Sequence, residues 1–201
     1  MINLFNINSY KNSNFNGSSY YNQKFSLSKM DGIPCAYCGK KTLSLSKFDK
    51  KLYKLKSIEE FLQLGEEYKE YLDEKELQHL NKKYLTRFPL GPKIALRTLF
   101  MPHIATKEHI IPRSNGGIDD IKNYIVTCYK CNSARKSIPL YNLFKSDKNI
   151  SENINNHINF LKKFIPKLIK TKKIAPKYKH YPEIISESIK VASNNQLDIK
   201  I

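Results

Sequence analysis

The sequence is short of acidic residues and has no long apolar run, and each shortage narrows the class of protein. It has 18 Asp and Glu residues against 35 Lys and Arg, giving a net charge of +17 at pH 7. This balance favours polyanionic partners, with nucleic acid ahead of an anionic membrane. No apolar stretch approaches the roughly 18 residues that a membrane-spanning helix needs, so we expect neither a transmembrane segment nor a membrane partner.

The N-terminal residues lack the basic start and apolar core of a signal peptide. We therefore expect a cytoplasmic protein, with delivery as a secreted toxin as the alternative. The chain also lacks internal repeats and a nucleotide-binding glycine loop. An AT-rich coding sequence would raise the Lys, Asn and Ile content, and is a second explanation for part of the positive charge.

The chain has only four cysteines, and all of them fall in two C-x-x-C pairs, Cys35 with Cys38 and Cys128 with Cys131. Gly39, which follows the first pair, allows the tight turn that directs both thiolates toward one ion. Two such pairs favour a tetrahedral zinc site over disulfides. A redox role is the alternative, but the chain lacks the βαβ pattern of a thioredoxin-like fold.

The densest chemistry lies in residues 107–136, KEHIIPRSNGGIDDIKNYIVTCYKCNSARK. Two β-prone runs, 109–111 and 124–127, flank a Gly-containing turn cluster and predict a hairpin, and a helix-compatible segment starts at Cys128. Glu108 and His109 would point to opposite faces of a regular strand, so a shared site requires the strand to bend or end there.

The string E-H-I-I-P-R-S-x-G-G, a later Asn and then C-x-x-C-N-x-x-R resemble the HNH endonucleases of the ββα-metal class. The three family letters fall on His109, Asn123 and Asn132, which makes this an H-N-N variant. The resemblance covers roughly residues 104–140 and the upstream cysteine pair. It implies an α+β fold with a ββα-metal (HNH) core and a structural zinc site of four cysteines, extended by an inserted helical module and C-terminal helices. It also implies metal-dependent endonuclease activity on DNA phosphodiester bonds.

The resemblance further implies a role for each site residue. Glu108 and Asn132 would hold one divalent metal, Mg²⁺ or Mn²⁺, against a phosphate oxygen, and carboxylate and amide oxygens suit such a hard cation. His109 would take a proton from the attacking water. Asn123 would hold the loop and the histidine in orientation. Family members more often carry Asp at the position of Glu108, whose longer side chain would place the metal differently.

Positive side chains in and beyond this segment are candidates for binding the nucleic-acid backbone. Residues 162–179 contain eight lysines and no acid, which predicts salt-dependent contact with phosphates, with a solvated face as the alternative. DNA is the expected substrate and RNA the alternative. The candidates are Arg113, Arg135, Lys136, Lys162, Lys163 and Lys170.

We expect three parts: an Asn-, Ser- and aromatic-rich segment (1–30), a nuclease domain (31–144) with a helical insert at about 50–92, and a basic helical extension (145–201). The aromatic residues of the first part either pack on the core or form an arm that stacks on bases. In the extension, residues 151–165 predict an amphipathic helix that Pro166 ends or kinks, and residues 183–193 a last short helix.

The insert shows two helix starts, a capping box at Ser57 and a second cap at Asp73 ahead of a helix carrying Leu77, Leu80 and Tyr84. The segment 88–92 then breaks the helical pattern. Residues 57–77 hold eight acidic and two basic side chains. They form a solvated face, a surface for a protein partner or an internal negative regulator.

Two other function classes fit the sequence. One is a zinc-dependent nucleic-acid-binding module with weak or absent catalysis, and the other is an adaptor whose acidic insert docks a protein. The oligomeric state does not follow from the sequence.

Overall fold

The computed structural model describes residues 26–194. The expected N-terminal segment therefore lies outside the described residues, except for 26–30, which contain the 3-10 helix η1 (Ser26–Lys29).

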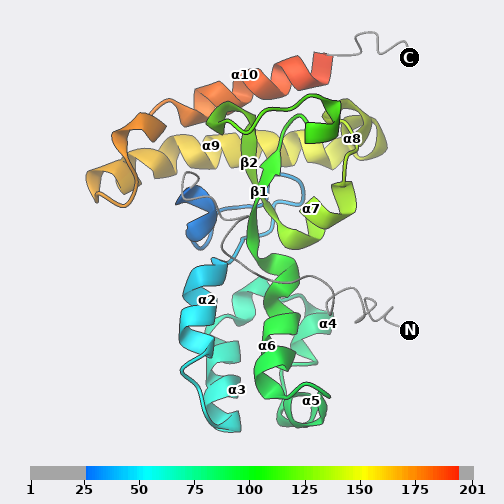
Figure 1. Cartoon of the computed structure of the whole chain (residues 1–201), viewed down its shortest axis with the longest axis vertical. Coiled ribbons are helices and arrows are strands. Elements are labelled where there is room, and N and C mark those ends of the chain that lie inside the picture. The colour runs from blue at the N-terminus through cyan, green and yellow to red at the C-terminus, as the bar shows by residue number, and fades with distance from the viewer. Residues whose placement is uncertain (1–25, 195–201) are drawn as a thin grey trace.

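A two-stranded hairpin lies between two groups of helices (Figure 1). Strand β1 (Ala105–His109) pairs antiparallel with β2 (Tyr124–Cys128), and helix α7 (Tyr129–Arg135) follows β2 directly. The intervening loop contains two 3-10 turns, η4 (Arg113–Asn115) and η5 (Ile121–Asn123). This confirms the predicted hairpin and helix, but β1 ends where the sequence suggested that it begins, at His109.

One group of helices forms a lobe that starts and ends beside the hairpin (Figure 1). Two of its helices, α2 and α6, were not predicted. The sequence of α2 is rich in lysine, and α6 follows the segment 88–92, which breaks the helical pattern of the sequence. Pro92 is the first residue of α6, a position where its fixed φ and missing N–H favour a helix start. The lobe comprises α2 (Leu45–Leu52), α3 (Ile58–Glu67), η2 (Lys69–Tyr71), α4 (Glu74–Leu77), α5 (Lys82–Arg87), α6 (Pro92–Phe100) and η3 (Met101–His103).

Both predicted helix starts in the lobe are confirmed. Ser57 and Glu60 form a complete capping box at α3, and Asp73 and Glu76 form another at α4. The single helix predicted after Asp73 is wrong, because the chain turns after α4 and Asn81 caps a separate helix, α5.

The other group comprises α8 (Leu140–Ser146), α9 (Lys148–Lys170), η6 (Pro176–Tyr178) and α10 (Tyr181–Asn194). Pro166 does not end α9, which continues to Lys170. Pro166 and the residue four positions earlier, Lys162, are both exposed, so water can bind the carbonyl that loses its helical partner. The last helix is confirmed, beginning two residues earlier than predicted.

Two clusters of buried side chains form two cores. The first joins the cysteine-bearing segment and β2 to the apolar faces of α9 and α10. The second lies inside the helical lobe and runs from Leu43 to Ile104. These two residues form a parallel β-bridge, so the lobe leaves and rejoins the rest of the chain at one place.

Among residues 26–194, no helix combines the length and apolar character that a membrane crossing requires.

Candidate functional site

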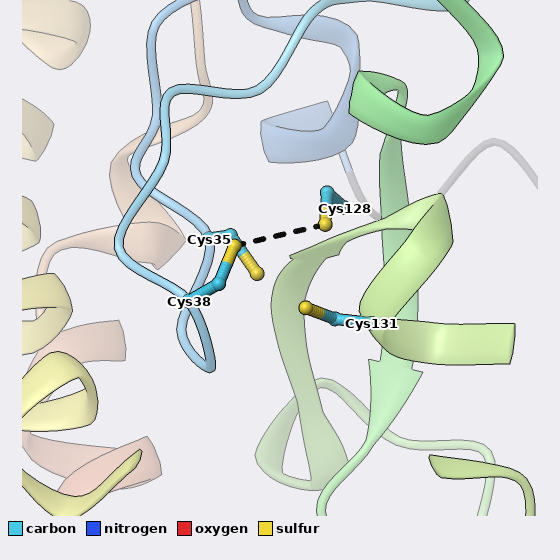
Figure 2. A group of neighbouring side chains, drawn as sticks. All are labelled: Cys35, Cys38, Cys128 and Cys131. Atoms are coloured by element: carbon cyan, nitrogen blue, oxygen red, sulfur yellow. Dashed lines mark hydrogen bonds between the residues drawn. The ribbon is translucent and has the colours of Figure 1, made fainter. Parts of the chain in front are cut away.

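The four cysteines converge on one point, although the two pairs are far apart in the sequence (Figure 2). Their sulfur atoms all lie within 4.8 Å of one another, and Cys38 Sγ is 3.9 Å from Cys128 Sγ. Tetrahedral zinc with Zn–S bonds of about 2.3 Å would separate its sulfur ligands by about 3.8 Å. The four residues therefore fit a structural zinc ion, as the sequence predicts.

Local backbone geometry explains the convergence. Gly39 adopts φ +72°, and its N–H donates to the carbonyl of Cys35, which closes the turn of the first pair. The second pair spans the junction of two elements, since Cys128 ends β2 and Cys131 lies in the first turn of α7. Ala36 N–H donates to Val126 O, which fixes the first pair beside β2.

His109 is the last residue of β1 and pairs with Tyr124 across the hairpin. Its imidazole is partly buried and packs edge-on against the Tyr124 ring, with centroids 5.0 Å apart. Burial lowers the pKa of His109 to about 4, with further lowering by the positive charges of Arg113 and Lys107. The imidazole is therefore neutral near pH 7, the form that accepts a proton.

Asp119 is a residue that the sequence analysis missed. Its Oδ1 lies 2.9 Å from His109 Nε2 and accepts a hydrogen bond from the Tyr124 hydroxyl, while its Oδ2 accepts one from Arg113. Lys107 Nζ lies 3.9 Å from the same carboxylate. Its position in the sequence could have predicted this contact, because Asp119 follows the Gly-Gly turn, where a hairpin loop returns toward the end of the first strand.

Glu108 does not join His109 on the same side of the strand. Its side chain is buried, and Oε1 accepts a hydrogen bond of 2.8 Å from Arg135 Nη1. Burial raises the pKa of Glu108 to about 7, and the Arg135 guanidinium opposes that increase. The strand does not bend between residues 108 and 109, so their alternation places them on opposite faces.

The prediction that Arg135 contacts phosphate is wrong, because its side chain is buried in the protein. Arg135 is 2% exposed, and its guanidinium donates to Tyr37 Oη, Glu108 and the carbonyls of His109, Ile110 and Ile138. A buried guanidinium needs several acceptors, and these groups supply them. Arg135 therefore links the segment of the first cysteine pair, through Tyr37, to the end of β1.

Asn123 is buried and holds the loop together. Its Oδ1 accepts from Ile111 N–H, and its Nδ2 donates to the carbonyls of Ile111 and Ile118. Gly117 makes this closure possible, because a Cβ there would lie 1.8 Å from Ile111 O. These bonds anchor the loop on both sides of η4 but do not reach the His109 ring.

Asn132 projects from α7 toward β1. Its Nδ2 donates to Thr106 Oγ1 at 3.0 Å and to Lys107 O at 3.4 Å. The amide group thus lies beside the strand that carries Glu108 and His109, with its nitrogen directed to the protein.

The other predicted phosphate contacts are exposed. Arg113 is paired with Asp119 at the loop, and the others lie on α7's end and along α9. No residue of the described chain forms an ion pair with any of the eight lysines between 162 and 179. The exposed lysines of the predicted site are Lys136, Lys162, Lys163 and Lys170.

Comparison with known proteins gives one match. A family model described as HNH endonuclease matches residues 98–137, which hold both strands, the loop and α7. Searches of the curated proteins and of the solved structures found no match. The matched segment contains His109, Asn123, Asn132 and the second cysteine pair, in the hairpin-and-helix arrangement described above. Residues 98–137 are therefore similar to the HNH endonuclease family in sequence and in the order of their elements.

Proposed function

We propose that this protein is a metal-dependent HNH endonuclease that hydrolyses phosphodiester bonds in DNA. The observation that carries the proposal is the placement of His109 at the end of the matched hairpin. It is partly buried, neutral near pH 7 and hydrogen-bonded to a carboxylate. Such an imidazole is suited to take a proton from a water molecule.

In this proposal His109 is the general base, and Asn123 keeps the loop that carries Asp119 in place. Glu108 and Asn132 would hold one Mg²⁺ or Mn²⁺ ion, and their carboxylate and amide oxygens are the donors that such cations prefer. The ion would stabilise charge on the phosphate and the leaving oxygen. Glu108 would have to share its carboxylate between the ion and Arg135, since Arg135 already binds Oε1.

The exposed lysines of residues 162–179 would bind the DNA backbone without reading its sequence. All eight are exposed on the last turns of α9 and the connection to α10. Such contacts give affinity that falls with salt. We also propose that residues 31–144 are the nuclease domain and 145–201 its basic extension, with α9 and α10 packed on the domain's first core.

A second candidate is a zinc-dependent nucleic-acid-binding module with weak catalysis. The Glu108–Arg135 pair favours it, because one proposed metal ligand is already neutralised by a buried cation. This candidate keeps the cysteine cluster and the lysine surface, and makes no use of His109.

Cleavage of supercoiled plasmid by zinc-loaded protein separates the candidates. With Mg²⁺ or Mn²⁺ we expect nicking that is absent when these ions are left out of the buffer and that His109→Ala reduces by about 10²–10⁴-fold, the usual contribution of a general base. His180→Ala, at an exposed histidine outside the hairpin, is the matched control and should cut like wild type. Plasmid binding without cleavage would favour the binding module. Full activity of His109→Ala would contradict the assignment of the base.

A further inference from the structure

In the hydrogen bond between His109 and Asp119, the imidazole is the donor and the carboxylate is the acceptor. Asp119 approaches the ring nitrogen Nε2, at 2.9 Å from Oδ1. An ionised carboxylate can only accept, so Nε2 must carry the proton. In a neutral imidazole the other nitrogen, Nδ1, is then unprotonated and has a free lone pair.

The carboxylate is itself held from several directions. The Tyr124 hydroxyl donates to Oδ1 and Arg113 donates to Oδ2, so both oxygens face donors. Lys107 adds a positive charge 3.9 Å away, and its ammonium also lies over the Tyr124 ring. These neighbours favour the ionised form of Asp119 and keep it in place.

The loop that carries Asp119 is fixed just before it. Asn123 binds the carbonyl of Ile118, the residue preceding Asp119, and Gly117 packs against the backbone of Ile111. The Asp119 side chain is 47% exposed, yet its backbone is positioned by these contacts.

We infer that Asp119 is a positioning residue, which holds His109 in the tautomer whose Nδ1 accepts the proton of the attacking water. This inference rests on the proposed function. In the proposed step the water O–H bond breaks, its proton moves to Nδ1, and the hydroxide oxygen forms the new bond to phosphorus. The resulting imidazolium is stabilised by Asp119 and later loses its proton to solvent. Asp119 acts through His109 and need not touch the substrate.

Asp119→Asn changes this arrangement with almost no change in size. The amide has one accepting oxygen, whereas the carboxylate accepts from donors on both sides. When that oxygen binds the charged Arg113, the amide NH2 faces Nε2 and can only donate to it. His109 is then driven to the opposite tautomer, with its proton on Nδ1.

A spectroscopic experiment tests the tautomer without relying on activity. Zinc-loaded protein with ¹⁵N-labelled histidine is compared as wild type, Asp119→Asn and Asp120→Asn, with His109→Gln used to assign the His109 signals. Asp120 is the matched control, since this neighbouring carboxylate accepts from Lys122 N–H and caps η5. We expect wild type and Asp120→Asn to show a protonated Nε2 and an unprotonated Nδ1, and Asp119→Asn to lose this pattern. An unchanged His109 pattern in Asp119→Asn would overturn the inference.

Plasmid cleavage by the same proteins provides the functional readout. Asp119→Asn should lower kcat by about 10²-fold or more, with little change in KM, because a wrongly protonated base affects the chemical step. Asp120→Asn should cleave like wild type. Equal kcat for the two variants would overturn the inference. A wild type that never cleaves would contradict the proposed function, while the ¹⁵N spectra would still decide whether Asp119 sets the tautomer.

Discussion

The cysteine cluster and the proposed catalytic ligands use the same hairpin, but the fold assembles them to different degrees. Cys128 lies opposite the first residue of β1 and His109 is the last. The four sulfur atoms already face one another within 4.8 Å. By contrast, Glu108 Oε1 accepts a hydrogen bond from Arg135, so one of the two proposed metal ligands already has a protein partner. Under the proposed function, zinc would be a permanent structural ion and the catalytic metal exchangeable, since that metal would compete with Arg135 for Glu108.

Loss of the proposed zinc ion should have the largest effect, because its four thiolate ligands would tie the segment 35–38 to the start of α7. Structural zinc contributes roughly 10–16 kcal/mol in small domains, as much as or more than the total stability of a typical domain. We expect Cys128→Ser or a strong zinc chelator to unfold the domain, as measured by circular dichroism and zinc content. Dialysis into buffer without Mg²⁺ is the control and should leave the fold intact. Retention of a cooperative thermal transition without zinc would contradict the structural role.

Breaking the Glu108–Arg135 pair should have the next largest effect. Arg135→Met leaves a buried carboxyl group and several carbonyls without their donor, at a cost of about 3–5 kcal/mol. Adding Glu108→Leu should recover part of this loss, because the carboxyl group no longer needs a partner. Urea unfolding of the zinc-loaded single and double variants measures both effects. If the double variant is no more stable than Arg135→Met, the pair is not coupled as the structure indicates.

The stability at acidic pH should depend on His157, which packs beside the first cysteine pair. His157 is fully buried, its Nδ1 lies 2.6 Å from Pro34 O, and its Nε2 has no hydrogen-bond partner in residues 26–194. Burial lowers its pKa to about 4. Between pH 6.5 and 4 the imidazole of His157 is protonated in the unfolded chain but neutral in the folded chain. The free energy of unfolding is therefore highest above pH 6.5 and decreases as the pH falls toward 4.

The predicted loss is at most about 3 kcal/mol, because folding lowers the pKa of His157 from 6.5 to about 4. His157→Asn keeps a donor for Pro34 O and should flatten the dependence of unfolding free energy on pH between about 6.5 and 4. His180→Asn, at an exposed histidine, should leave the wild-type slope unchanged. Identical slopes for wild type and His157→Asn would contradict the assignment of this acid sensitivity to His157.

The sequence predicted the features that depend on local patterns. The C-x-x-C-G spacing indicated the cysteine cluster, and the S-x-x-E and D-x-x-E patterns located the starts of α3 and α4. The hairpin and α7 followed from β-prone runs around a Gly-Gly turn. Each of these patterns lies within a short stretch of the sequence, although the two cysteine pairs themselves are far apart.

What the sequence did not predict depends on contacts between distant segments. Arg135 was predicted to contact phosphate, but it is buried and donates a hydrogen bond to Tyr37, 98 residues away. The role of Asp119 depends on how the loop returns to the end of β1. Helix α2 is only eight residues long, and its position depends on the packing of Phe48 and Leu52 into the lobe core and on the ion pair between Asp49 and Arg97 of α6.

The bridge between Leu43 and Ile104 has a consequence for folding and for protein engineering. Leu43 N–H donates to His103 O and Ala105 N–H donates to Leu43 O, so the two ends of the helical lobe are in contact. Once the lobe has folded, the chain between the two cysteine pairs behaves as a short loop, and closing it costs little additional entropy. Replacing residues 45–102 by a short Gly-containing turn should therefore let the cysteine pairs meet as they do in the full chain, so the lobe is a separable insertion.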